Sequence, residues 1–436
     1  MRMRRGFLWL TLTVLTVGAA PRHGAAAESL ADAWRLALTR DPALAAATSD
    51  VDGARAGEQA ARGARWPSLD ATAGYTRLNA SPALDVATPG LLFRSGPIFR
   101  DDQFVSGSLQ LKLPLYSGGQ ISAGIDAAHQ AFLGASEDQQ SAVAALKLEV
   151  AEAYVGLLRA RRTLGAAQSR VASLGAHADD VAQMVARDLV PRTDLLAAQV
   201  ARANAEQDRV HAATSVEIAQ AIYNRRLGEP LGRAPELEQQ IAADAFLPIT
   251  ALDTLVQRAL GARSELKALS ARAESLASQA HGEAGKALPQ LALVGGYAHL
   301  DNQILDRQDF STVGVGFTWN LFDGGQARHR AAALESAGRA AQRRLEDLRS
   351  RVELEVRQAW LDVREARVRL ESSGQAVAQA EENLRSSREL YAVGLSSSTQ
   401  VLDAIALQTA ALVNRDNAEL DESLAELRLS YAVGDL

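Results

Sequence analysis

The amino-acid sequence predicts a mainly α protein with a β-barrel contribution, built from two repeated halves. Three observations support this fold class. The motif Leu115–Gln120 (LYSGGQ) returns as Leu321–Gln326 (LFDGGQ), and the alignment continues without a gap through the rest of each half. Two proline-free stretches, 115–190 and 290–436, carry Ala, Leu, Glu and Arg at helical spacing. Segments that precede the long helices alternate apolar and polar residues, as amphipathic strands do.

Residues 1–27 have the pattern of a secretory signal peptide. Three arginines stand within the first five residues, and Phe7–Val17 is an apolar run too short to span a bilayer. Ala25–Ala27 provides a small-residue cleavage site, so we expect the mature chain to begin at Glu28. No later segment reaches the length of a transmembrane helix.

The first repeat is organised around one long helix. Leu146, Val150, Ala153 and Leu157 recur at i, i+4, i+7 and i+11 within it. Such a helix is roughly 100 Å long at 1.5 Å per residue. Two shorter helices together match its length, so we expect them to stack end to end along it. The first repeat, 28–228, is predicted to contain a helix at 29–64, strands at 69–77 and 104–116, the long helix at 120–187 and a helix at 193–227.

The second repeat copies this order after a proline-rich linker at 229–251. The two halves differ in length at one place, where 79–103 corresponds to 301–309, and this difference predicts surface loops. The second repeat, 252–436, is predicted to contain a helix at 252–286, strands at 291–299 and 310–322, the long helix at 326–393 and a helix at 399–433.

The four predicted strands require partners from other chains. In 104–116, Val105, Leu109 and Leu111 are apolar, whereas Ser106 and Ser108 between them are polar. Four strands cannot close a barrel and leave two open edges. Several chains must therefore combine, with the apolar face toward lipid and the polar face toward a wet lumen. The alternative is a small sheet that packs on the helices of a soluble protein.

Composition excludes several function classes. The formal net charge is −6, so no basic excess supports nucleic-acid binding. The absence of cysteine removes disulfides, thiolate metal sites and cysteine nucleophiles, and it favours a bacterial envelope protein. The histidines lack metal-binding spacing, and Gly118–Gly119 has no phosphate-loop context. The sequence therefore predicts no enzyme activity, no cofactor and no metal site.

Two kinds of motif resemble the TolC-type outer membrane efflux protein family, also called outer membrane factors. The first lies where a strand meets a long helix, at Leu113–Gly119 (LPLYSGG) and Trp319–Gly325 (WNLFDGG). The second is Tyr391–Ser396 (YAVGLS), which is followed by Val401–Ala404 (VLDA). The resemblance covers Glu28–Leu436.

The resemblance implies a homotrimer in the cell outer membrane that extends into the periplasm. Each chain would give four strands to a twelve-stranded transmembrane β-barrel surrounded by outer membrane lipid. The antiparallel helical hairpins would form a periplasmic α-barrel, with the linker 229–251 at its equator. The loops 79–103 and 301–309 would face outside the cell. A periplasmic adaptor (membrane fusion) protein and an inner-membrane transporter would dock at the helix turns near 187–194 and 393–400.

The resemblance also assigns roles to residues at this periplasmic tip. The first-half turn has Asp188 where glycine is usual, and Gln400 stands where an aspartate is often seen. The residues that match the adaptor-docking tip are Val393, Gly394, Leu395, Ser396, Leu189 and Val190. The residues at the positions of the periplasmic gate are Asp403, Asp194, Gln400 and Tyr391.

The sequence therefore predicts the outer membrane channel of a tripartite efflux or type I secretion system. It would be a passive conduit that opens when the adaptor and the transporter favour the open state. The alternative is a soluble periplasmic coiled-coil adaptor protein. An adaptor would share the long hairpins, but it would have neither the repeated amphipathic strands nor the chain-wide duplication.

Overall fold

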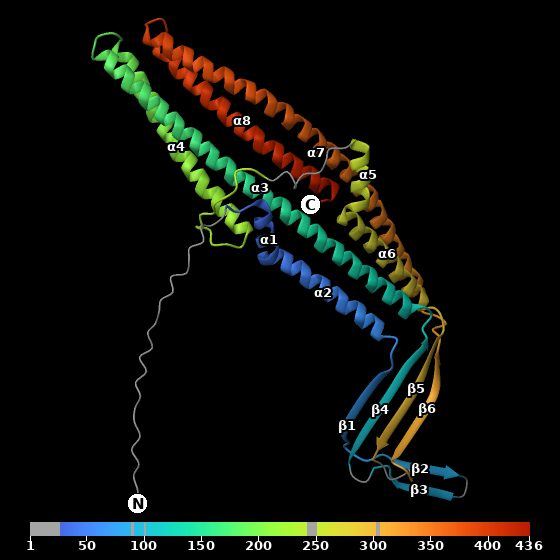
Figure 1. Ribbon diagram of the computed structural model, residues 1–436. Coiled ribbons are helices and arrows are strands. Elements are labelled where there is room, and N and C mark those ends of the chain that lie inside the picture. Colours follow the sequence, from blue (N-terminus) through green and yellow to red (C-terminus); the bar gives the residue numbers. More distant parts are fainter. Residues whose placement is uncertain (1–26, 89–90, 100–101, 242–250, 302–305) are drawn as a thin grey trace, which may run out of the picture.

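The computed structural model describes residues 27–88, 91–99, 102–241, 251–301 and 306–436. Apart from Ala27, the predicted signal peptide at 1–27 lies outside the described residues, as does 242–250 of the predicted linker. Helices form a long body, and a sheet extends from one end of it (Figure 1). The predicted fold class, mainly α with four amphipathic strands in two repeated halves, is confirmed.

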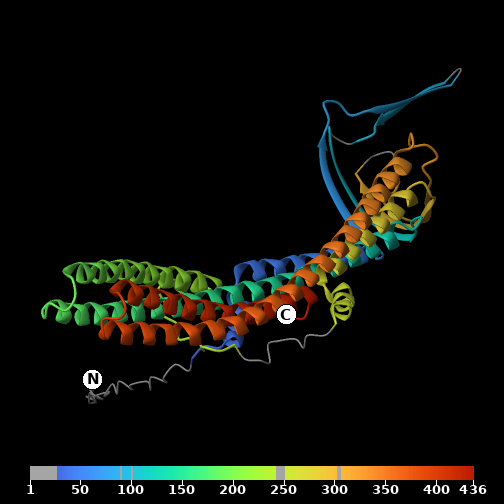
Figure 2. The same ribbon diagram turned by 90° about the horizontal axis from the view of Figure 1, so that it is seen from above.

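Two long helices run the length of the body (Figures 1 and 2). They are α3 (Gln120–Val185) with 66 residues and α7 (Gln326–Ala392) with 67. Shorter helices pack beside each of them. The helices of the first repeat beside α3 are α1 (Leu30–Arg40), α2 (Pro42–Gly63) and α4 (Arg192–Arg226). Those beside α7 are α5 (Leu252–Ala262), α6 (Ser264–Gly285) and α8 (Ser398–Val433). Two of these helices of the second repeat, α6 and α8, also pack against α3.

The predictions of one continuous helix at 29–64 and at 252–286 are wrong, because each is broken once. Asp41 is extended, and its side chain accepts a hydrogen bond from the Leu44 amide at 2.8 Å, with Pro42 in the first helical position. This is a strong helix start, since proline needs no amide partner there. Arg263 occupies the corresponding place in the second repeat and is also extended (φ −57°, ψ 119°).

The four-stranded sheet is antiparallel, with the order β1-β4-β5-β6. Its register places Leu111, Leu293 and Val315 on one face and Lys112 and Val294 on the other. Within the described residues, β1 and β6 each pair on one side only, so both edges of the sheet are open. The strands are β1 (Ser68–Arg77), β4 (Gln103–Tyr116), β5 (Gln290–Leu300) and β6 (Asp309–Thr318).

Two details around the sheet differ from the predictions. The predicted strand at 310–322 ends early because Gln290, the first residue of β5, pairs with Thr318 and offers no partner beyond it. The chain then turns back, and Trp319 Nε1 donates to the Ala287 carbonyl at 3.1 Å. The predicted loop at 79–103 contains an antiparallel pair of strands, β2 (Ala83–Thr88) and β3 (Leu91–Pro97). Of the other predicted loop, 302–305 lies outside the described residues.

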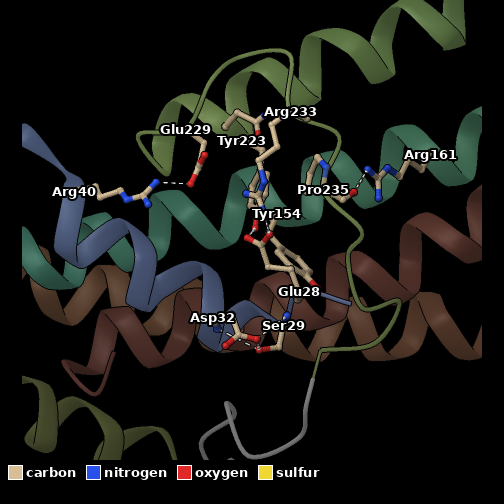
Figure 3. Close-up of polar contacts among 11 residues, drawn as sticks. Glu28, Ser29, Asp32, Arg40, Tyr154, Arg161, Tyr223, Glu229, Arg233 and Pro235 are labelled. Atoms are coloured by element: carbon tan, nitrogen blue, oxygen red, sulfur yellow. Dashed lines mark hydrogen bonds and ion pairs between the residues drawn. The ribbon is translucent and has the colours of Figure 1, made fainter. Parts of the chain in front are cut away.

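A polar clasp holds the described part of the linker against the first repeat (Figure 3). The hydroxyl of buried Tyr154 donates to the carbonyls of Glu28 and Glu238 at 3.0 and 2.9 Å. The hydroxyl of buried Tyr223 donates to the Glu28 carboxylate at 2.6 Å, and that carboxylate also pairs with Arg233. The clasp ties residues near the predicted start of the mature chain to the middle of α3 and the end of α4.

Candidate docking and gate site at the helical tip

The turns of the two helical hairpins lie side by side at the end of the molecule opposite the sheet (Figure 1). A buried apolar cluster joins the hairpins there, with Leu174 and Val181 from α3, Leu384 from α7, and Val401 and Ile405 from α8. The tip is therefore one packed unit that both repeats build, rather than two free loops.

The two turns have the same backbone geometry. Gly394 has φ 77°, and the Leu395 amide donates to the carbonyl five residues earlier at 2.9 Å. Asp188 has φ 54°, and the Leu189 amide makes the equivalent bond at 3.0 Å. Both turns end their helix with a left-handed residue in a Schellman motif. Aspartate is one of the few residues that adopt this conformation, so the missing glycine at 188 changes the side chain but not the turn.

The residues of the predicted docking tip present apolar side chains to solvent. Leu395 is 76% exposed, Val393 68% and Leu189 67%. Val190 and Ser396 are half-buried, and Val190 packs against the tip cluster. Three large apolar side chains grouped at one end of a molecule are typical of a contact surface.

Of the four predicted gate residues, Tyr391 and Asp194 lie together. Tyr391 is buried in the tip cluster at the end of α7. Asp194 is half-buried in the first turn of α4. Burial and the nearby Asp194 carboxylate raise the pKa of Tyr391 above its ordinary value. Asp194 belongs to the first hairpin and Tyr391 to the second, so the pair lies where the two hairpins meet.

The other two predicted gate residues both lie near the start of α8. Asp403 is exposed on α8, and within the described residues its carboxylate has no hydrogen-bond or ion-pair partner. Gln400 instead closes the start of α8, because its side-chain oxygen accepts from the Ser397 amide at 3.1 Å while Ser397 Oγ accepts from the Gln400 amide at 3.4 Å. This reciprocal capping box holds Gln400 in a structural position.

Two residues that the sequence did not single out occupy the centre of the tip. His177 on α3 is 5% exposed and Ser398 on α8 is 2% exposed. His177 Nε2 and Ser398 Oγ are 3.0 Å apart, and the His177 ring lies 5.5 Å from the ring of Tyr391. The pair joins residues 221 positions apart in the chain, so no local spacing could reveal it.

The described residues contain no group of three or more His, Cys, Asp or Glu side chains able to hold a metal ion. Among the same residues, no helix combines the length and the hydropathy that crossing a membrane requires.

The family to which this architecture belongs follows from comparison with known proteins. The family model described as "Outer membrane efflux protein" matches residues 33–228 and 255–435, which include most of both repeats. The chain belongs to this family. This chain is an outer membrane channel component of tripartite efflux systems and reaches into the periplasm, as predicted. The soluble adaptor is not favoured, since the match includes the strands as well as the hairpins.

Individual outer membrane proteins also resemble the chain in sequence and in structure. The chain is 26% identical over 425 residues to the outer membrane protein TolC of Vibrio cholerae, and the match covers 94% of this chain and 91% of TolC. The solved structure of CusC has a TM-score of 0.80 at 16% identity, covering 94% of this chain and 92% of CusC. VceC from Vibrio cholerae has a TM-score of 0.79 at 20% identity, covering 93% and 96%. These two structures share the fold.

Proposed function

We propose that three copies of this outer membrane efflux protein form one passive conduit across the outer membrane and the periplasm. The observation that carries the proposal is the four-stranded sheet, whose edges at β1 and β6 have no partner strand in the described part of the chain. Its outer face is apolar and unprotected, with Val313 85% and Val315 65% exposed. Three such sheets joined edge to edge would supply twelve strands, close the barrel and turn the apolar face toward lipid.

Exposed apolar stripes on the helices support the same assembly. Each stripe follows one helix face and has no cover within the described chain. The stripe on α4 consists of Leu196, Val200, Val210, Ile218 and Ile222. The stripe on α7 consists of Leu354, Leu361 and Val368. Neighbouring copies would bury these side chains, which otherwise remain in water along the helical body.

We expect the protein purified in detergent to be a trimer. Light scattering corrected for detergent would give its mass, and electron microscopy would show threefold symmetry. The physical reason is that the described residues of one chain leave two sheet edges unpaired. A stable monomer with its full β content would contradict the proposal.

At the periplasmic end, the proposed partners are a periplasmic adaptor protein and an inner-membrane transporter. The exposed side chains of Val393, Leu395 and Leu189 would form the docking contact. The contact is apolar, so its strength would come from the area that an adaptor covers. The conduit itself would perform no bond chemistry, and the transporter would supply the energy.

For the gate, we propose that Asp403 forms a ring of three carboxylates around the threefold axis. Like charges about 6 Å apart repel by roughly 3 kcal/mol at an effective dielectric of 20. The carboxylate has no internal partner within the described residues, so bound cations would have to offset this repulsion. Such a ring makes the entrance selective for cations.

We expect Asp403→Ala to weaken the preference for cations and the block by multivalent cations. Single-channel conductance in planar bilayers measures both. Asp188→Asn is the matched control, because it removes one charge from the tip at an exposed turn and keeps a residue that accepts the left-handed conformation. Selectivity unchanged in Asp403→Ala and in the double variant with Asp194→Ala would show that neither carboxylate acts in a gate.

A further inference from the structure

A buried histidine connects the two hairpins at the tip. His177 belongs to the first hairpin through α3, and Ser398 belongs to the second through the first turn of α8. Their side chains meet at 3.0 Å, and both are buried. Any movement that separates the second hairpin from the first breaks this contact and brings water to the imidazole.

Charged and titratable groups face His177 from three helices. Asp180 lies on α3 itself, Asp194 on α4, and Arg388 on α7, where the Tyr391 ring also packs. Burial is the strongest influence and lowers the pKa of His177 below its ordinary value of 6.5. Asp180 and Asp194 oppose this shift, and Arg388 reinforces it. In the packed tip, His177 is therefore held neutral to a lower pH than a histidine in water.

We propose that His177 and Ser398 form a latch between the hairpins, which holds the tip closed while the imidazole is neutral and releases it when the imidazole is protonated. The latch rests on the proposed function, since it regulates the same periplasmic gate. It makes His177 a positioning residue: it touches no substrate, and it sets how readily the second hairpin separates from the first.

The sign of the effect follows from the two environments of the imidazole. In separated hairpins His177 meets water and protonates near its ordinary pKa, whereas in the packed tip burial resists the charge. The stability of the packed tip is therefore complete above that ordinary pKa and declines as the pH falls below it. Between about pH 7.5 and about pH 5.5, the ratio of separated to packed tips should rise by up to about tenfold per chain.

The separation of the hairpins can be measured without reference to conductance. The chain has no cysteine, so Leu189→Cys and Leu395→Cys introduce two unique, exposed sites for spin labels, one on each turn. Labelled chains diluted into unlabelled trimers report the distance within one chain by pulsed electron paramagnetic resonance. We expect a longer-distance population to grow on acidification in the otherwise native chain. His177→Gln, which can hydrogen-bond to Ser398 but cannot gain a proton, should lose this response.

His211→Gln is the matched control, because His211 is exposed on α4 and lies outside the tip cluster. It should keep the full pH response. A distance distribution that does not change with pH in the parent, or that changes equally in His177→Gln, would overturn the latch. If His177→Gln fails to fold, His177→Asn provides the same comparison. Failure of the channel proposal would appear separately, as an absence of trimers and of conductance at every pH.

Discussion

Val315→Arg should remove most of the protein from the outer membrane. Val315 lies on the apolar face of β6, opposite Leu293 of β5, and 65% of it is exposed in the single chain. In the proposed barrel that face would meet lipid. An arginine on the lipid face near the middle of the membrane costs roughly 2–4 kcal/mol. The folded fraction in vesicles, measured at equilibrium in denaturant, and the amount in the outer-membrane fraction of cells would both fall.

Val294→Arg is the matched control for this change. Val294 pairs with Gly314 of β6, so it lies at nearly the same height as Val315. It faces the other side of the sheet, where Lys112 pairs with it from β4. A wet lumen accepts the guanidinium, so we expect near-parental insertion and an altered ion selectivity. Equal loss of insertion in both variants would indicate a sheet that does not separate lipid from lumen.

Gly394→Trp should abolish export while the amounts of trimer and of inserted barrel stay at the parental level. A Cβ at Gly394 would have no atom within 4 Å, so the indole would project from the tip without a clash inside the molecule. The left-handed backbone would cost roughly 1–2 kcal/mol, which is confined to the turn. The bulk would stand beside Val393 and Leu395, where the adaptor is proposed to dock. Retention of a fluorescent transporter substrate in cells reports the loss.

Gly394→Asn separates docking from the turn itself. Asparagine tolerates the left-handed conformation, as Asp188 does in the first turn with φ 54°. Its small side chain leaves most of the apolar contact free, so export should remain close to the parental level. Parental export in the tryptophan variant would mean that this turn makes no essential contact with an adaptor.

The duplication made most of the fold predictable, because two copies of one pattern reinforce each other. The duplication also indicated a break in the first helix of each repeat, which the helix predictions overlooked. Asp41–Pro42 is a helix-start signal within 29–64, and its alignment with Arg263–Ser264 transfers the break to the second repeat. Arg263 has no such signal of its own. Its guanidinium bonds to the Ala432 carbonyl at 3.2 Å and pairs with Glu265 and Glu355, contacts that depend on the folded structure.

The tip was predictable in its turns but not in its interior. Gly394 predicts a turn and Leu395 an exposed apolar residue, and in the structure Gly394 is left-handed and Leu395 is exposed. The contact between His177 and Ser398 depends on how two hairpins from different repeats pack, which no pattern within either helix encodes. Gln400 shows the opposite case: its position suggested a gate residue, yet its side-chain oxygen accepts a hydrogen bond from the Ser397 amide.

The helices α3 and α7 are nearly equal in length, and each one sets the distance from the sheet to the tip. With 66 and 67 residues, each helix carries its own turn to the same level, where the tip cluster joins them. Removing one heptad from α3 alone would retract its turn by roughly 10 Å and leave the other in place. The two turns would then be staggered, and His177 would no longer face Ser398. A shorter or longer tunnel therefore requires matched deletions or insertions in both repeats. The lengths of α3 and α7 together set how far the molecule extends between the two membranes, and the two lengths can change only together.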